Sequence, residues 1–189
     1  MAAGVLVVLA GCGHSAGRAA GSPLPDPATP SASPASGELV TGTGYTFRLP
    51  AGWPPDRSPV SVVGAGTGSI PDLTVTGPPK PGVVTDILTV TLELWTTDDE
   101  HASDPSPGLV DGLVLHSDDP FVLDGLAARA LTFSYSVGAQ RLVSRQITCV
   151  HDEVRLTVGF TTDGLDAGPG LHAFDEILAS WSWIPERRS

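Results

Sequence analysis

The clearest periodicity in the chain is an alternation of apolar and polar side chains from Asp86 to Trp95. Successive side chains of a β-strand point to opposite faces, so a repeat of two residues is typical of a strand with one buried face. We therefore predict a half-buried strand here, as part of a sheet. Its apolar face carries Leu88, Val90, Leu92 and Leu94, and its polar face carries Thr89, Thr91 and Glu93.

A β-hairpin is predicted from residue 140 to residue 161, with a two-residue turn at His151-Asp152. In the register set by that turn, the apolar faces of the two strands coincide, which supports the pairing. The predicted opposite pairs are Cys149 with Val154, Ile147 with Leu156, and Val143 with Phe160.

The strand before this hairpin leaves two alternatives open. A two-residue turn at Gly138-Ala139 places Leu131, Phe133 and Tyr135 on the face opposite the predicted core, because each residue of slip inverts the side chains. Either this loop has an odd number of residues, with Gly138 in a left-handed bulge position, or both faces of the sheet are covered.

An amphipathic helix is predicted after Gly168-Pro169-Gly170, with its apolar stripe lying across the sheet. The stripe consists of Leu171, Phe174, Ile177, Leu178 and Trp181. Residues 44–53 predict a first strand. Residues 54–82 are rich in Pro and Gly and predict irregular structure, with strand-like pieces at 60–63 and 73–76 and one edge strand in this region. The fold class is therefore α+β, an antiparallel sheet flanked by helices.

Between Trp95 and Phe121 the chain carries seven acidic residues and neither Lys nor Arg, so we place this region at the surface. Within it, residues 107–115 allow a short helix. A calcium loop is not indicated, because the acidic residues do not have the spacing of such a loop and its central glycine is missing.

The N-terminus ends a short apolar run at Leu9-Ala10-Gly11-Cys12 and continues into a tail rich in Ser, Ala and Pro. The run is too short to span a membrane, which takes roughly 20 apolar residues, but it suits an export signal. The four residues resemble the lipobox of bacterial lipoproteins, in which the cysteine receives a diacylglyceryl group. The resemblance implies a signal peptide at 1–11 and an acylated Cys12. The small residues and prolines that follow predict an extended tether at 12–38, which leaves a domain at 39–186 and a tail at 187–189.

Charge and cysteine content limit the partners. The 189 residues include 10 basic and 21 acidic side chains, a net charge of -11, which argues against nucleic acids and anionic lipid surfaces. With Cys12 acylated, Cys149 has no partner in its own chain, so any disulfide would join two chains. Two cysteines without a nearby pair of histidines exclude a structural zinc site. We expect no cofactor, since the chain has neither a Walker loop nor a dinucleotide-binding glycine motif.

Three segments resemble the PsbP-like fold, which photosystem extrinsic subunits share with a Ran-GTPase release factor, and within it the LpqN-type actinobacterial lipoproteins. They are Tyr45-Thr46-Phe47-Arg48-Leu49-Pro50-Ala51-Gly52-Trp53, Leu123-Asp124-Gly125-Leu126-Ala127-Ala128-Arg129 and Phe174-Asp175-Glu176-Ile177-Leu178-Ala179-Ser180-Trp181. The resemblance implies an antiparallel sheet between helices in a protein that binds or scaffolds, without catalytic residues. The acidic stretch stands where relatives have a substantial helix.

Arg145 is the candidate binding residue, because the predicted register places it on the apolar face between Val143 and Ile147, opposite Val158. A buried guanidinium needs a partner. One interpretation is structural, an ion pair with Glu93 or Asp175. The other is an anion anchor at the back of a hydrophobic cleft with Phe133 and Tyr135 as its walls.

Catalytic residues are not predicted. The chain lacks a Gly-x-Ser-x-Gly elbow, and the histidines at 101, 116, 151 and 172 fall in predicted loops or at a helix start. We therefore expect a membrane-anchored envelope lipoprotein on the extracytoplasmic side, binding a hydrophobic or glycolipid ligand.

The alternatives are a scaffold for an envelope protein and, third, a hydrolase. The first hypothesis predicts a closed apolar cavity near Arg145, the second an exposed apolar patch above a few hundred Å², and the third a histidine within reach of a nucleophile.

Overall fold

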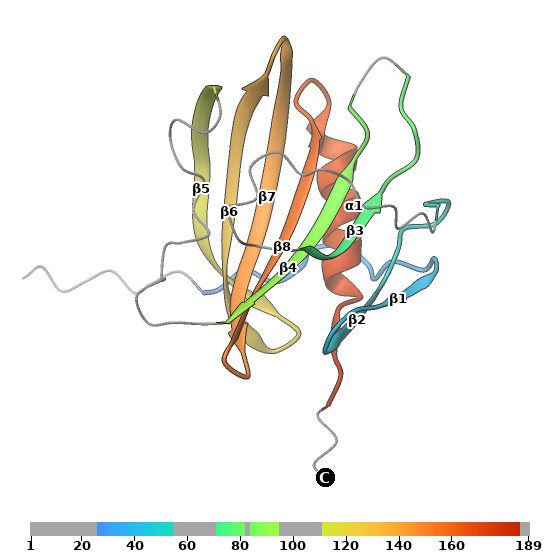
Figure 1. The fold of residues 1–189 in the computed structure, drawn as a ribbon, viewed down its shortest axis with the longest axis vertical. Helices are drawn as coiled ribbons and strands as arrows, with labels where there is room; N and C mark the ends of the chain where they lie inside the picture. The colour runs from blue at the N-terminus through green and yellow to red at the C-terminus, as the bar shows by residue number, and fades with distance from the viewer. Residues whose placement is uncertain (1–25, 55–70, 82–83, 95–110, 186–189) are drawn as a thin grey trace, which may run out of the picture.

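The core of the computed structural model is an antiparallel sheet with strand order β3-β4-β8-β7-β6-β5 (Figure 1). The structure describes residues 26–54, 71–81, 84–94 and 111–185. The strands of this sheet are β3 Pro71–Thr76, β4 Ile87–Leu94, β5 Asp111–Leu123, β6 Leu126–Val137, β7 Gln140–His151 and β8 Val154–Asp163. A second, smaller sheet has the order β1-β2-β9, with β1 Leu39–Thr41, β2 Tyr45–Arg48 and β9 Ser182–Trp183.

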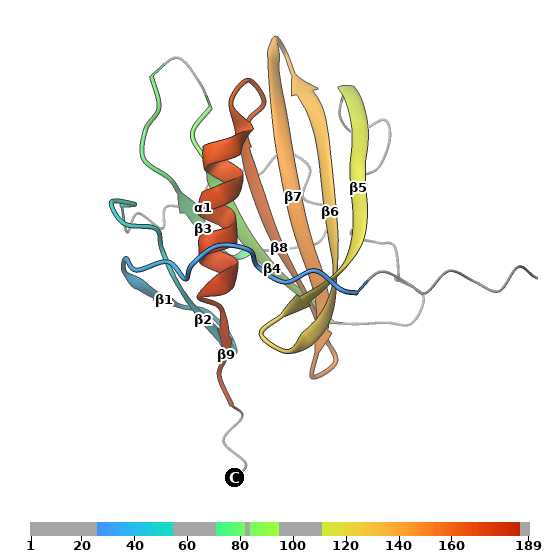
Figure 2. The ribbon, with the colours of Figure 1, turned by 180° about the vertical axis from the view of Figure 1, so that it is seen from behind.

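Helix α1, Ala167–Ala179, packs on one face of the larger sheet (Figure 2). Its buried residues include Phe174, Ile177 and Leu178, which confirms the predicted apolar stripe. Trp181 follows the helix and stacks on Tyr45 and Phe47 of β2, with ring centroids 4.6 and 5.4 Å away. The α+β class is confirmed, with α1 as the one helix of the described residues, on one face of the sheet.

The β7–β8 hairpin forms as predicted, but its turn lies at Asp152-Glu153 and not at His151-Asp152. Both turn residues have positive φ, 49° and 63°, as a type I′ turn requires. The register is therefore shifted by two residues: Cys149 pairs with Leu156, and Arg145 pairs with Phe160. A shift of two leaves every side chain on its predicted face.

The β6–β7 connection resolves the two alternatives left by the sequence. Val137 pairs with Gln140, so the turn has two residues, Gly138 and Ala139. Leu131 and Phe133 consequently lie on the face opposite α1, and both are buried. Apolar side chains are thus buried on both faces of the sheet.

The acidic region is partly a strand, which corrects the prediction of a surface loop with a short helix at 107–115. Residues 111–115 belong to β5, and residues 107–110 lie outside the described residues. β5 is an edge strand, where exposed charges and a proline such as Pro120 are tolerated. Asp118 on this strand forms an ion pair with Arg129 of β6, with an N–O distance of 2.8 Å.

Residues 26–38, which composition assigned to the tether, lie against the domain (Figure 2). Ala28 forms a parallel bridge with Phe121 on the outer edge of β5. Ala35 is buried, and its N–H donates to the carbonyl of Glu176 in α1. The described part of the domain therefore begins before residue 39. The predicted signal peptide at 1–11 and tail at 187–189 lie outside the described residues.

A carboxylate links the two sheets. Asp72 of β3 accepts hydrogen bonds from the N–H and hydroxyl of Thr43 and from the hydroxyl of Tyr45, at 3.1, 2.7 and 2.7 Å. Burial alone would raise the pKa of Asp72, but these hydrogen bonds outweigh it and hold the pKa below its ordinary value. Burial, followed by the bond to Asp72, raises the pKa of Tyr45.

The close approach of α1 to β8 predicts the effect of a methyl group at Gly170. A Cβ there would lie 2.4 Å from Oγ1 and 2.9 Å from Cβ of Thr162, so Gly170→Ala should lower the free energy of unfolding by about 1–3 kcal/mol. Gly168→Ala is the matched control in the same helix, because nothing lies within 4 Å of its added Cβ. It should raise stability by about 0.5 kcal/mol. Urea unfolding measures both, and equal effects would contradict the packing.

The Asp72 network predicts a pH-dependent contribution to stability. A carboxylate whose pKa is lowered on folding stabilises the native state above its unfolded pKa, and this contribution is lost as the pH falls through the folded pKa. Asp72→Asn should therefore cost on the order of 1 kcal/mol at pH 7. The difference from the wild type should shrink below about pH 4. Unfolding curves between pH 7 and pH 2.5 test this, and a difference that stays constant with pH would refute it.

Candidate functional site

A pocket of about 290 Å³ opens on the face of the large sheet that carries α1, beside the helix. The helix packs over β8, and the pocket lies over the β5–β6–β7 half of the same face. Its lining comes from three strands, the helix and the segment before β1. The lining residues are Asp26, Ala28, Ser117, Asp119, Pro120, Phe121, Ala130, Thr132, Arg145 and Leu171.

Arg145 lines the pocket and forms the ion pair that the structural interpretation predicted. Its Nη1 donates to Oδ1 of Asp175 on α1 at 2.7 Å, and both side chains are largely buried. The guanidinium carbon lies 5.7 Å from the centre of the Phe121 ring, within cation–π range. Glu93, the other predicted partner, bonds to Arg155 on the opposite face. The charge of Arg145 is thus neutralised in the fold.

Phe133 and Tyr135 do not lie in the same site as Arg145. In the observed register Arg145 is opposite Thr132, so the odd-numbered residues of β6 point away from α1. Phe133 is buried on that other face, 6.0 Å from the ring of Tyr135, and burial raises the pKa of the Tyr135 phenol despite a hydrogen bond involving Thr161. The predicted cleft of these three residues is therefore wrong.

The apolar wall of the pocket is made instead by Phe121, Ala130 and Leu171. Sequence reasoning missed Phe121 because β5 was interpreted as an acidic surface segment. The alternation of Phe121 and Leu123, both 1% exposed or less, was the signal available for this strand.

The polar lining is rich in hydrogen-bond acceptors. Asp26 and Asp119 are exposed carboxylates, and Ser117 and Thr132 contribute hydroxyls. Because Asp175 already balances Arg145, the two carboxylates leave the pocket net negative. Such a lining disfavours anionic groups and suits hydroxyl-bearing or cationic ones.

A second polar cluster lies on the same face of the sheet. His116 Nε2 is 2.9 Å from the Ser134 hydroxyl, which also accepts a hydrogen bond from Arg141 Nη2 at 3.1 Å. A histidine within reach of a hydroxyl is the geometry that the hydrolase alternative required. However, Ser134 is 1% exposed in the middle of a strand, so its oxygen has no free side from which to attack a substrate. The contact positions His116 and Arg141.

The remaining predicted chemistry lies elsewhere or outside the described residues. The ring of His151 stacks on Trp183 at 4.5 Å, His172 is exposed on α1, and His101 and Cys12 are not described. Within the described ranges, no three His, Cys, Asp or Glu side chains are grouped to hold a metal ion. The same ranges contain no helix long and apolar enough to cross a membrane. Burial of the Cys149 thiol raises its pKa to about 12, which makes it a poor nucleophile.

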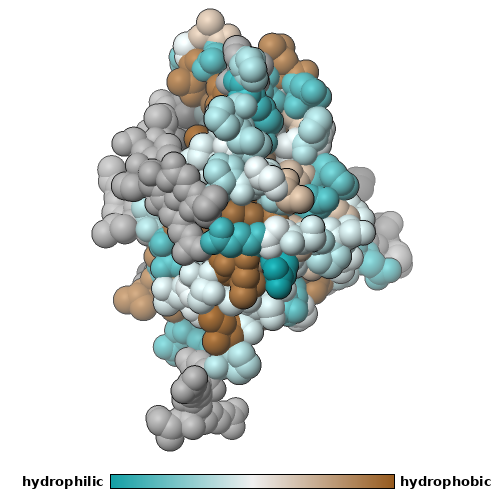
Figure 3. All heavy atoms as spheres, turned by 90° about the vertical axis from the view of Figure 1, so that its right-hand side faces the viewer, coloured by the Kyte–Doolittle hydropathy of each residue, from teal (hydrophilic) through white to brown (hydrophobic). Residues whose placement is uncertain are grey.

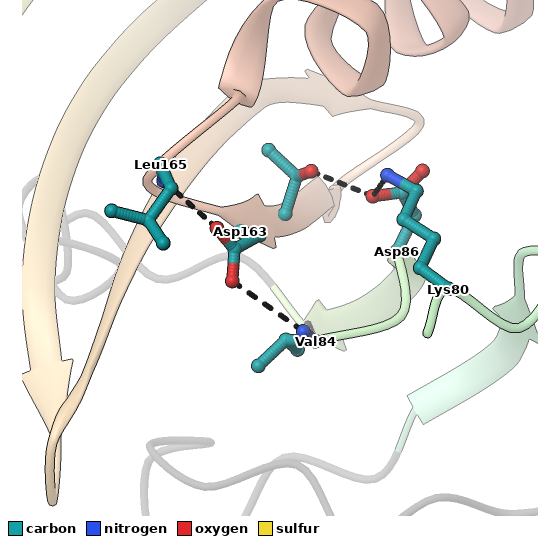
Figure 4. Close-up of polar contacts among 6 residues, drawn as sticks. Lys80, Val84, Asp86, Asp163 and Leu165 are labelled. Atoms are coloured by element: carbon teal, nitrogen blue, oxygen red, sulfur yellow. Dashed lines mark hydrogen bonds and ion pairs between the residues drawn. The ribbon is translucent and has the colours of Figure 1, made fainter. Parts of the chain in front are cut away.

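Two buried carboxylates near the start of α1 have structural partners (Figure 4). Asp86 accepts hydrogen bonds from Lys80 at 2.7 Å and from the Thr162 hydroxyl at 2.6 Å. Asp163 accepts from the backbone N–H of Leu165 at 2.8 Å and from that of Val84 at 3.4 Å. These bonds join β8 and the approach to the helix to the chain before β4, so both carboxylates have a structural role.

No protein-family model matches the sequence, and no curated protein is similar to it in sequence. Solved structures are similar in fold. The crystal structure of LpqN, involved in cell envelope biogenesis of Mycobacterium tuberculosis, has a TM-score of 0.51 at 16% identity, covering 78% of this chain and 83% of that one. The solution structure of cyanobacterial PsbP from Synechocystis sp. PCC 6803 has a TM-score of 0.51 at 15% identity, covering 78% and 92%.

A crystal structure from Bacteroides thetaiotaomicron also reaches a TM-score of 0.51, at 10% identity, but this chain spans only 49% of its length. The chain therefore has the PsbP-like fold. At these identities the likeness shows the fold alone, and it confirms the PsbP-like fold that the three sequence segments indicated.

Proposed function

We propose that this protein is an accessory binding module of the cell envelope, anchored by lipid on Cys12, that holds a hydrophobic or glycolipid ligand between β5–β7 and α1. The observation that carries the proposal is the pocket beside α1, with Arg145 in its wall. Its volume lies near the lower end of the range for small-molecule sites, so it suits one ring or a short segment of a longer ligand.

The chemistry of the lining favours a glycolipid within that class. Phe121 and Leu171 offer apolar contact area, while Asp26 and Asp119 accept hydrogen bonds from hydroxyl groups. Nη1 of Arg145 is engaged by Asp175, and within the described residues its other N–H groups have no protein acceptor. These donors and acceptors match sugar hydroxyls, because a hydroxyl group both donates and accepts hydrogen bonds.

The anchor and the pocket are connected through the chain. The segment that follows Cys12 reaches the domain at Asp26 and Ala28, and both residues line the pocket. An envelope location also agrees with LpqN, which shares the fold and is involved in envelope biogenesis. In this proposal the anchor keeps the pocket close to the membrane that supplies its ligand.

A protein-binding scaffold is the second candidate, favoured by exposed apolar residues around the small sheet. Leu39 and Ile184 are 49% and 39% exposed. Figure 3 shows hydrophobic residues gathered in the middle and lower part of the face that carries β1 and β2. The patch is bordered by hydrophilic residues, as is common for a surface that meets a partner.

The anchor is tested by Cys12→Ala, which removes the acylated thiol. In the source organism, the variant should move from the membrane fraction to the soluble fraction, because the acyl chains provide the membrane affinity. Cys149→Ala is the matched control and should stay with the membrane, since Cys149 is buried in the domain. Cys12→Ala remaining membrane-bound would show that the lipobox interpretation is wrong.

The ligand is tested by native mass spectrometry after exposure of the full chain to an envelope lipid extract. The wild type should retain a defined adduct, Arg145→Ala should retain less, and Leu171→Glu should lose it because a charge then faces the apolar wall. Leu165→Glu is the matched control, since Leu165 is 87% exposed and outside the pocket lining. A wild type that emerges at its bare polypeptide mass would overturn the binding function and leave the scaffold.

A further inference from the structure

We propose that His116, Ser134 and Arg141 form an anion subsite that takes a phosphate group. The three side chains come from adjacent strands, β5, β6 and β7, on the sheet face that carries α1. None of them lines the pocket of the proposed function, so the subsite stands on separate contacts.

The buried hydroxyl of Ser134 holds the other two side chains in place. It accepts a hydrogen bond from Arg141 Nη2 at 3.1 Å and lies 2.9 Å from His116 Nε2. Ser134 is 1% exposed, and a buried hydroxyl hydrogen without an acceptor is costly. The hydroxyl therefore takes part in both contacts, and the His116 and Arg141 side chains that it holds are both exposed to solvent.

Arg141 carries a charge that the fold does not balance. Of the six Lys and Arg side chains in the described ranges, Lys80, Arg129, Arg145 and Arg155 form ion pairs with carboxylates. Among the described residues, the guanidinium of Arg141 forms a hydrogen bond with Ser134 alone, so most of the N–H groups of this side chain have no protein acceptor. The chain has a net charge of -11, so an arginine without a carboxylate partner is unusual in it. The planar guanidinium can bond two phosphate oxygens at once, so Arg141 beside His116 indicates a phosphate site.

The neighbouring backbone keeps Arg141 near the start of α1. Its carbonyl accepts the N–H of Gly164, and its Cγ lies 3.0 Å from the position of a Cβ at Gly164. By register, two acidic residues lie near Arg141. Asp163 of β8 pairs with Leu142, so its side chain is on the other face of the sheet, where it accepts the N–H groups of Val84 and Leu165. Asp111 of β5 is opposite Ser136, two strands from Arg141. Two strand spacings are roughly 10 Å, so Asp111 weakens the positive potential without cancelling it.

The subsite adjoins the pocket along β6. Ser134 is two residues from Thr132, which lines the pocket, and both point to the same face. The spacing is roughly 7 Å, so one ligand with a phosphate group and an apolar part is long enough to occupy both.

The test is an NMR titration of the full chain with inorganic phosphate at pH 7.5, following the His116 ring and the Arg141 side chain. Arg141→Gln should weaken binding by about tenfold to a hundredfold through loss of charged hydrogen bonds. His116→Gln should weaken it less, and Asp111→Asn should strengthen it about twofold. Arg48→Gln is the matched control, since exposed Arg48 lies on β2 and donates to the carbonyl of Gly37. Equal binding by the wild type and Arg141→Gln, or equal loss with Arg48→Gln, would overturn the subsite.

A second titration with dihexanoyl phosphatidic acid distinguishes the source of the phosphate. Tighter binding than inorganic phosphate, with the gain erased by Leu171→Glu, assigns a lipid headgroup. Equal binding of the two assigns free phosphate. Either result supports the subsite only if Arg141→Gln weakens that binding by the same factor, about tenfold to a hundredfold. The pocket of the proposed function is tested separately, by the retained adduct and its loss in Leu171→Glu, so the pocket can fail while the subsite stands.

Discussion

The packing of α1 on the six-stranded sheet decides where a ligand has room. Apart from Thr162, the β4 and β8 residues on that face are apolar, and Leu88, Val90, Val158 and Phe160 are fully buried. Further along the same face, β6 places a threonine and two serines at positions 132, 134 and 136. An apolar helix gains nothing by covering hydroxyls, so the boundary between apolar and polar rows leaves the pocket beside the helix.

The Arg145–Asp175 pair lies on this boundary and ties β7 to α1. A single charge there would be costly, whereas the pair satisfies both groups at 2.7 Å. Because Arg145 and Asp175 neutralise each other, other side chains set the charge of this sheet face. The pocket end keeps the unbalanced carboxylates of Asp26 and Asp119, while Arg141 keeps an unbalanced positive charge at the other end. The unbalanced charge on this sheet face is therefore negative at the pocket and positive at Arg141.

The spacing of apolar residues, and with it the face on which each side chain lies, was predictable from the sequence, whereas the exact pairing of the strands was not. The helix stripe and the faces of β4, β7 and β8 were predicted correctly, because they depend on spacing alone. The partner of Arg145 was left between Glu93 and Asp175, and the packing of α1 on β7 decides for Asp175. The hairpin register was wrong by two residues, since nothing local favours Asp152-Glu153 for positive φ over the preceding pair. Phe133 was assigned to the site for its aromatic ring, although the two-residue turn at Gly138 already implied the opposite face. β5 was missed because its charges, tolerated at an edge, outweighed its alternation.

The separation between the carboxylates at the pocket and the guanidinium of Arg141 gives a ligand one preferred direction. A phosphate at Arg141 is roughly 7 Å from the pocket along β6, and the carboxylates of Asp26 and Asp119 repel it from the other end. An apolar segment attached to that phosphate gains contact area only toward Phe121 and Leu171, where Ala28 pairs with the edge of β5. Ala28 belongs to the segment that begins at the proposed anchor. The apolar end of the ligand would therefore lie beside the segment that leads to the proposed anchor, which is the side from which that proposal has a lipid enter.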